Sequence, residues 1–103
     1  SPPDEWEAQA ARLVPVRVYR GPVGVGNYLW RLDEAAREEA RRWLDAHKAM
    51  QTPATLALYW ADGKRTVAEI ADLVEMESDS RDIEYLVRYF RLLEAVGLMR
   101  MAS

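Results

Sequence analysis

Few residues of this chain have the types and spacing that enzyme chemistry requires. It contains a single histidine, His47, and no cysteine. Zinc hydrolases hold their metal with several His and carboxylate ligands, so a lone imidazole does not complete such a site. Without Cys there are no disulfides, thiolate metal sites or Cys nucleophiles. We therefore expect no catalytic residue, no metal ligand and no cofactor in these residues. We interpret His47 as a core or interface side chain.

A glycine-rich stretch invites comparison with loops that bind phosphate. Gly21, Gly24 and Gly26 lie close together, but Leu29 occupies the third-glycine position of the dinucleotide-binding pattern. No crossover helix is predicted to open directly behind the stretch, as that pattern requires. The sequence therefore predicts an ordinary flexible turn here.

Two acids, Asp62 and Glu69, are the other candidates for acid–base chemistry, and both have a structural interpretation. Asp62 precedes Gly63, a pair typical of tight turns. Glu69 follows Thr66 by three residues, the spacing of a capping box at a helix N-terminus. We expect both carboxylates to serve the backbone around them.

The N-terminal half is predicted to contain two helices with a β-hairpin between them. Alternating apolar and polar side chains in 14–20 and 28–32 indicate two short strands, joined by the glycine-rich turn. A stripe of apolar side chains at helical spacing predicts a long helix that Asp33 caps. The expected elements are a helix at 4–13, strands at 14–20 and 28–32, and a helix from 33 to about 50.

The C-terminal half is predicted to contain three helices and a final strand. Thr52 is expected to cap a largely apolar helix over 54–61, with Pro53 at its first position. A second helix begins after Thr66, and the polar run 75–80 breaks it. Asp79 or Ser80 is expected to cap the last helix, which Gly97 ends, and 98–101 alternates as a strand.

These elements predict a single domain over 1–103, mostly α with a few short β-strands. Three short helices with an Asp-Gly turn between the first two form a helix-turn-helix core, and the order of elements is that of a winged helix over about 53–101. Lys64–Thr66 and Leu98–Met101 could pair beside it. A full wing needs one more strand, which Val16–Tyr19 could supply unless the wing is absent.

Two stretches carry a resemblance to known families. Leu58-Tyr-Trp-Ala-Asp-Gly-Lys-Arg-Thr-Val-Ala-Glu-Ile70 and Tyr89-Phe-Arg-Leu-Leu-Glu-Ala-Val-Gly-Leu98 resemble winged-helix domains at the C-terminal end of some M28-type aminopeptidase-like proteins. The resemblance covers about residues 56–100. It implies an accessory module whose catalytic centre lies on polypeptide outside these residues. The same skeleton is similar to PqqD-like peptide-recognition domains, although there the strands lead directly into the helices, without a helix such as 33–50.

Winged helices often bind DNA, but the charges of this chain disfavour that function. The net charge is −3, and residues 53–103 hold six basic and nine acidic side chains. The entrance of the last helix, which would enter the major groove, carries Asp79, Asp82 and Glu84 against Arg81. Carboxylates there would face phosphates with the wrong sign. The candidates for a compensating basic patch are Arg17, Arg20, Lys64, Arg65 and Arg100. We expect them to be dispersed or paired with the acids of the second half.

The last helix has a second stripe on the face opposite its core side. Tyr85, Arg88, Tyr89 and Leu92 recur at i, i+3, i+4 and i+7. One interpretation is that Trp6 or the hairpin covers this stripe within the domain. The other is a docking surface, because Tyr and Arg are enriched where protein interfaces bind most tightly.

The leading hypothesis is a non-catalytic accessory domain that docks onto a protein, either a peptidase-like domain of the same polypeptide or a second copy. The alternatives are a DNA-binding regulator and a peptide-recognition domain. No apolar run reaches the length of a membrane span, so no membrane partner is expected. The absence of Cys suits a cytoplasmic location.

Overall fold

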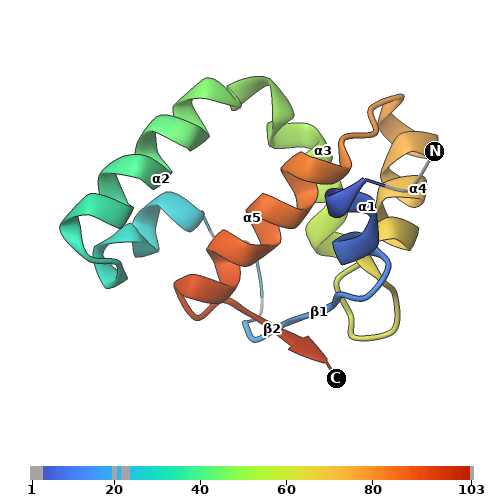
Figure 1. Ribbon diagram of the computed structural model, residues 1–103, viewed down its shortest axis with the longest axis horizontal. Helices are drawn as coiled ribbons and strands as arrows, with labels where there is room; N and C mark the ends of the chain where they lie inside the picture. Colours follow the sequence, from blue (N-terminus) through green and yellow to red (C-terminus); the bar gives the residue numbers. More distant parts are fainter. Residues whose placement is uncertain (1–3, 20, 22–23, 103) are drawn as a thin grey trace.

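Seven helical segments and two short strands make up the part of the chain that the computed structural model describes, residues 4–19, 21 and 24–102. The chain is therefore mostly helical with one small antiparallel sheet, the α+β class that the sequence predicts (Figure 1). The α-helices are α1 Glu5–Ala10, α2 Glu34–Ala46, α3 Gln51–Tyr59, α4 Val67–Ser78 and α5 Ile83–Ala95. The 3-10 helices are η1 Val25–Arg31 and η2 Lys48–Met50, and the strands are β1 Val14–Arg17 and β2 Met99–Ala102.

Helix α5 is the centre of the fold. It crosses the middle of the molecule, with α1 and α4 on one side and α2 on the other (Figure 1). Its apolar side chains face more than one neighbour, and α1, α3, α4 and β2 all pack against it. Burial of this much apolar surface is the main force that holds the helices together. The buried residues of α5 are Ile83, Tyr85, Leu86, Val87, Phe90 and Leu93.

The small sheet joins the two ends of the described chain. β1 and β2 are antiparallel, with Val16 opposite Arg100 and Val14 opposite Ala102. The other edge of β1 is hydrogen-bonded to the turn before α4, where the Gly63 N–H donates to the Pro15 carbonyl and Val16 bridges to Asp62. Of the predicted strand Val16–Tyr19, Val16 and Arg17 lie in β1 and pair with β2, whereas Val18 and Tyr19 lie beyond the end of β1. Direct pairing of Lys64–Thr66 with the last strand is wrong, because β1 lies between them.

The predicted hairpin of 14–20 with 28–32 is also wrong. Residues 25–31 form the 3-10 helix η1, in which Val25 and Leu29 are both buried. The period of four between these two side chains fits a helical turn, whereas a strand would place Tyr28 and Trp30 on one side. Both edges of β1 already have hydrogen-bonding partners, so a second strand from this region would have no edge to join.

The long helix predicted for 33–50 is interrupted. Asp33 caps α2 as predicted, accepting a hydrogen bond from the Ala36 N–H at 2.8 Å. The helix stops at Ala46, because the backbone of His47 leaves the helical region with φ −116° and ψ 30°. After η2, α3 begins at Gln51, so the predicted Thr52 cap is wrong and no side chain caps this helix. The break turns the chain so that α3 packs against α4.

The caps of the last two helices follow the sequence in part. The capping box at α4 is confirmed: the Glu69 N–H donates to Thr66 Oγ1 at 3.1 Å, and the Thr66 N–H donates to Glu69 Oε1 at 2.9 Å. α4 continues to Ser78, through the predicted break, and Asp79 ends it in the left-handed conformation. Asp82 caps α5, so the prediction of Asp79 or Ser80 is wrong.

Candidate docking groove

The structure separates the four residues of the predicted docking stripe. Tyr85 is only 4% exposed and lies beneath α2, where its ring stacks on Trp43 with centroids 5.1 Å apart. Tyr89 is partly buried and meets the edge of Tyr85 at 5.8 Å. Burial raises the pKa of Tyr85, and the neighbouring Tyr89 and Asp82 raise it further. These two tyrosines therefore belong to the interior of the domain.

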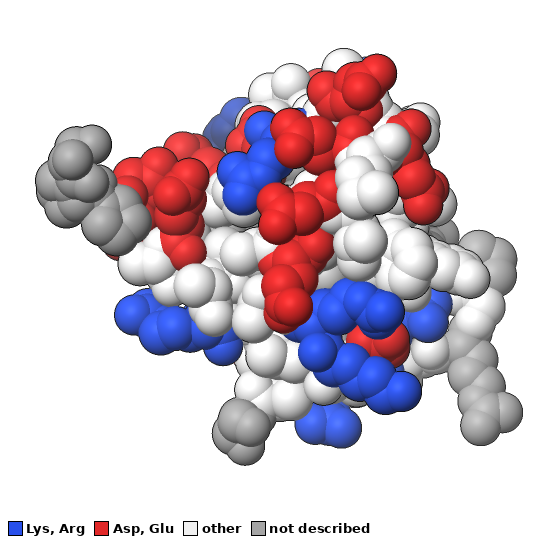
Figure 2. All heavy atoms as spheres, turned by 90° about the vertical axis from the view of Figure 1, so that its right-hand side faces the viewer, with Lys and Arg blue, Asp and Glu red and all other residues white. Residues whose placement is uncertain are grey.

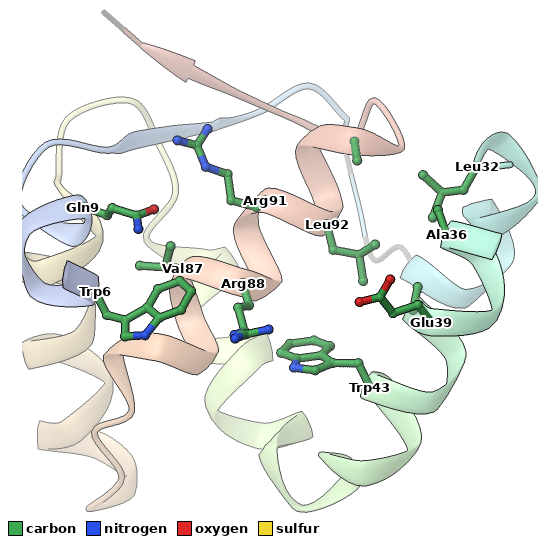
Figure 3. Close-up of a pocket in the computed structure, with 12 residues that line it drawn as sticks. Trp6, Gln9, Leu32, Ala36, Glu39, Trp43, Val87, Arg88, Arg91 and Leu92 are labelled. Carbon is green, nitrogen blue, oxygen red and sulfur yellow. The ribbon is translucent and has the colours of Figure 1, made fainter.

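Arg88 and Leu92 instead line an open groove. Its floor is the exposed side of α5 and its walls are α1 and α2, with a volume of about 430 Å³ (Figure 3). Most of the lining is apolar, with one tryptophan on each wall. The lining residues are Trp6, Gln9, Leu32, Ala36, Glu39, Ala40, Trp43, Val87, Arg88, Arg91, Leu92 and Ala95.

Arg88 lies between the two walls of this groove (Figure 3). Its guanidinium carbon is 4.8 Å from the centre of the Trp6 ring, and its Nε forms an ion pair with Glu84 Oε2 at 3.1 Å. In Figure 3 the guanidinium group is seen between the indoles of Trp6 and Trp43. A cation over an indole face is attracted by the ring quadrupole, so Trp6 holds Arg88 in place. Trp6 thus covers part of the stripe, as the interior interpretation predicted.

The groove lining carries two arginines and one glutamate, and each arginine is paired with a carboxylate of α5 at the rim. Arg88 and Arg91 come from the floor, and Glu39 comes from the α2 wall. Arg91 is paired with Glu94 at 2.8 Å, on the same helix. Both arginines keep almost half of their side chains exposed, 48% and 47%. Pairs this exposed contribute little stability, so both guanidinium groups stay available to another carboxylate.

The groove could have been found from the sequence only in part. Ala36 and Ala40 belong to the apolar stripe from which the sequence predicts the helix after Asp33, and both line the groove. The stripe indicates the face of α2 that turns inward, but not the hollow beside it. Arg91, Glu39 and Leu32 were missed, because their convergence depends on how α2 and η1 lie against α5.

His47 lies in the aromatic cluster next to the groove. Its Nδ1 is 2.7 Å from the Trp43 carbonyl oxygen, which accepts the hydrogen bond when Nδ1 carries the proton. The imidazole is 5.5 Å from the Tyr85 ring. Within residues 4–19, 21 and 24–102, no three His, Cys, Asp or Glu side chains are grouped as metal ligands would be.

The other residues considered for chemistry have structural positions. Gly24 precedes η1 and Gly26 lies within it, and only part of the glycine-rich stretch falls among the described residues. Asp62 accepts a hydrogen bond from the Lys64 N–H and pairs with Arg65 at 2.7 Å. Desolvation acts to raise the pKa of Asp62, but these hydrogen bonds and the Arg65 charge outweigh it and lower that pKa.. Asp62 thus holds the turn before α4.

Several basic residues lie at the small sheet but not all on one face, because Arg100 is opposite Val16 and Arg17 is opposite Met99. Backbone pairing brings Arg17, Arg100 and the turn that carries Lys64 and Arg65 to the same small sheet. Figure 2 shows basic side chains gathered at one end of this face, with a band of acidic side chains beside them. Arg65 is paired with Asp62, as expected. Arg20 was also a candidate and lies outside the described residues.

Comparison with known proteins gives no relative. No protein-family model, no curated protein and no solved structure matches this chain. Among the described residues, no helix is both long enough and apolar enough to cross a membrane.

Proposed function

We propose that this chain is a non-catalytic, winged-helix-like accessory domain that docks onto a protein partner. The observation that carries the proposal is the open apolar groove between α1, α2 and α5, with a tryptophan on each wall and two arginines on its floor. Clefts that combine aromatic walls with Arg side chains have the composition of protein-binding sites. An exposed apolar groove of this kind on a small domain is typical of a surface that binds a partner.

The winged-helix part of the proposal rests on the order of elements. Helices α3, α4 and α5 follow one another with a tight turn between the first two, and β2 follows α5. β1, from the N-terminal side, takes the position of an extra strand beside β2. The proposed partner is a peptidase-like domain of the same polypeptide, as the resemblance of 56–100 implies, and the proposed location is the cytoplasm.

DNA binding is the second candidate, and the grouping of cations at the small sheet favours it. The surroundings of α5 weigh against it. A reader helix must present its N-terminal residues to the major groove. In this chain Ile83 and Tyr85 are buried there, and Trp43 stacks on Tyr85. The exposed positions are the acids Asp82 and Glu84 and the base Arg81, which is paired with Asp72.

Peptide recognition is the third candidate, and one feature of the sheet favours it. Among the described residues β2 pairs only with β1, so its other edge presents free backbone groups. An extended peptide can add to such an edge as a further strand. β2 has only four residues, which limits the number of backbone hydrogen bonds that this mode can form.

A site-specific cross-link tests the docking function. A photoreactive residue at Ala36, inside the groove, is compared with one at Met76, which is 81% exposed and outside it. We expect the Ala36 probe to form one defined cross-link, to a fixed segment of the longer polypeptide or of a second protein, and the Met76 probe to form none. Equal cross-linking from both positions, or none from Ala36, contradicts the docking function.

A further inference from the structure

The secondary structure of the groove restricts what can bind in it. The elements that form it are helices α1, α2 and α5, with Leu32 from the end of η1. Backbone groups inside helices are already hydrogen-bonded, so these walls offer no sheet edge. A strand laid in the groove would lose water from its own backbone groups and gain no partners. A helix satisfies its backbone internally, and is the conformation that fits helical walls.

The charges of the groove restrict the partner further. Arg88 and Arg91 are three residues apart on α5, so their backbone positions lie about one turn apart. Figure 3 shows Arg88 between the two indoles and Arg91 pointing away from them, so pairing both with neighbouring carboxylates requires Arg91 to change rotamer, which its 47% exposure allows. Glu39 is the one acid in the lining. The two arginines are held by Glu84 and Glu94 at the surface, where such pairs are weak and readily exchanged. A carboxylate of the partner would form an ion pair with Arg88 or Arg91 when the partner covers the groove and excludes water from it.

We propose that the groove binds an amphipathic helix of a protein partner whose apolar stripe is bordered by carboxylates. Aliphatic side chains of this helix fill the hollow over Leu32, Ala36 and Leu92. Two acidic side chains one turn apart, on one margin of the stripe, pair with Arg88 and Arg91. This inference rests on the proposed docking function and specifies the chemistry of the partner.

Synthetic helices provide the probe. The acidic peptide is a helix of about 16 residues, with Leu at i, i+4 and i+7 and two Glu one turn apart on one margin. Two matched peptides carry Gln or Lys in place of both Glu. Affinity is measured by fluorescence anisotropy of the labelled peptide. The indole N–H signals of the ¹⁵N-labelled domain report where it binds, because Trp6 and Trp43 line the groove whereas Trp30 and Trp60 do not.

We expect the acidic peptide to bind about tenfold more tightly than the Gln peptide and to lose this advantage at high salt. The signals of Trp6 and Trp43 should shift, and those of Trp30 and Trp60 should not. The double variant Arg88→Glu, Arg91→Glu should reverse the preference in favour of the Lys peptide. The matched control, Arg41→Glu with Arg42→Glu, makes the same change in net charge on exposed positions of α2 and should leave the preference as it was.

A second variant avoids dependence on the contact between Arg88 and Trp6. Ala36→Phe fills the groove from α2 and leaves both arginines in place, and it should abolish binding of the acidic peptide. Equal binding of the Glu and Gln peptides, or tighter binding of the Lys peptide, overturns the acidic partner and leaves the docking function standing. If no peptide shifts Trp6 and Trp43, the helical partner is wrong. Only the additional absence of a cross-link from Ala36 removes the docking function as well.

Discussion

The rings of Trp43 and Tyr85 are stacked, with centroids 5.1 Å apart and planes inclined by 12°. This contact attaches α2 to the central helix α5, and His47 lies against both rings, at 4.7 Å from Trp43 and 5.5 Å from Tyr85. Because α2 forms one wall of the groove, the same contact sets the width of the proposed binding site. Stability and docking should therefore respond together when it is removed.

Trp43→Ala should lower the free energy of unfolding by about 3 kcal/mol, the lower end of the usual loss for a large aromatic side chain. The lower end applies because Trp43 is only partly buried. Urea denaturation followed by circular dichroism measures the change. Trp30→Ala is the matched control: Trp30 is 65% exposed, and the expected change is within about 0.5 kcal/mol. Equal losses for the two variants would mean that Trp43 does not hold α2 on α5.

Thr66→Ala should lower the free energy of unfolding by about 1 kcal/mol, because it removes the side chain that caps α4. Thr52 was also predicted to be a cap, but it lies inside α3 and no side chain caps that helix. Thr52→Ala is therefore the control and should change stability by less than about 0.5 kcal/mol. Chemical denaturation of both variants checks the pair, and an unchanged midpoint for Thr66→Ala contradicts the prediction.

Gly63→Ala should destabilise the domain by more than about 1 kcal/mol, for two reasons. Gly63 has φ +82°, and a Cβ there would be 2.9 Å from Val16 Cγ2. Gly21 has a similar φ of +79°, and a Cβ there would have no neighbour within 4 Å among the described residues, so Gly21→Ala isolates the cost of the backbone conformation. The difference between the two thermal midpoints then measures the contact of β1 with the turn before α4. Equal losses of stability in the two variants would mean that the Val16 side chain moves away from the added Cβ without a cost in free energy.

Tyr85 should make the domain less stable at alkaline pH. Burial raises the pKa of Tyr85 in the folded state above its ordinary value of about 10. Above that pH the unfolded chain loses the hydroxyl proton while the folded chain keeps it. The unfolded state then binds fewer protons, so stability falls as pH rises from about 10 through the folded pKa.

The measurement is the urea midpoint between about pH 8 and pH 11. Tyr85→Phe should make the fall in stability at the alkaline end less steep, because it removes one of three tyrosines, with Tyr19 and Tyr89, whose pKa burial raises. Tyr59→Phe alters a side chain that is 69% exposed and serves as the control with an unchanged slope. An identical slope in Tyr85→Phe and the unaltered chain contradicts the assignment of this pH dependence to Tyr85.

The features that could be predicted from the sequence are those that neighbouring residues decide. Thr66 and Glu69 form their capping box within one turn of helix, and Gly97 takes the left-handed conformation, with φ +81°, directly after α5. The prediction for 28–32 failed because Leu29 is drawn into the core and the partner edge of β1 is used by residues far along the chain. The alternation of apolar and polar residues within 28–32 shows neither the burial of Leu29 nor the occupation of the β1 edge.

The composition of the candidate site likewise depends on contacts between residues that are far apart in the sequence. The spacing of Tyr85, Arg88, Tyr89 and Leu92 predicts a second stripe on α5, but nothing in the spacing tells which members are covered. Trp43 stacks on Tyr85 from another helix, and Trp6 reaches Arg88 from the first one. A second stripe at helical period therefore predicts that a helix has neighbours on both sides. Which residues of the stripe are buried and which line a groove depends on how the neighbouring helices pack against it.

The last prediction concerns nucleic acid and separates the leading function from its main alternative. Arg17, Lys64, Arg65 and Arg100 are brought to one small sheet, and a duplex held by such a group would lose affinity steeply with salt. The slope would approach one unit of log-affinity per log-salt unit for each phosphate neutralised.

We expect no detectable binding of the isolated chain to a random duplex at low salt. Asp62 neutralises Arg65 at 2.7 Å, acidic side chains lie beside the basic group (Figure 2), and Tyr85 at the entrance of α5 is buried under Trp43. Fluorescence anisotropy with a labelled duplex measures it. The variant Lys64→Glu with Arg100→Glu is the control, and it should behave as the unaltered chain does. Micromolar binding that weakens steeply with salt, and that this variant abolishes, would contradict the docking hypothesis and favour a DNA-binding domain that reads the duplex through its sheet.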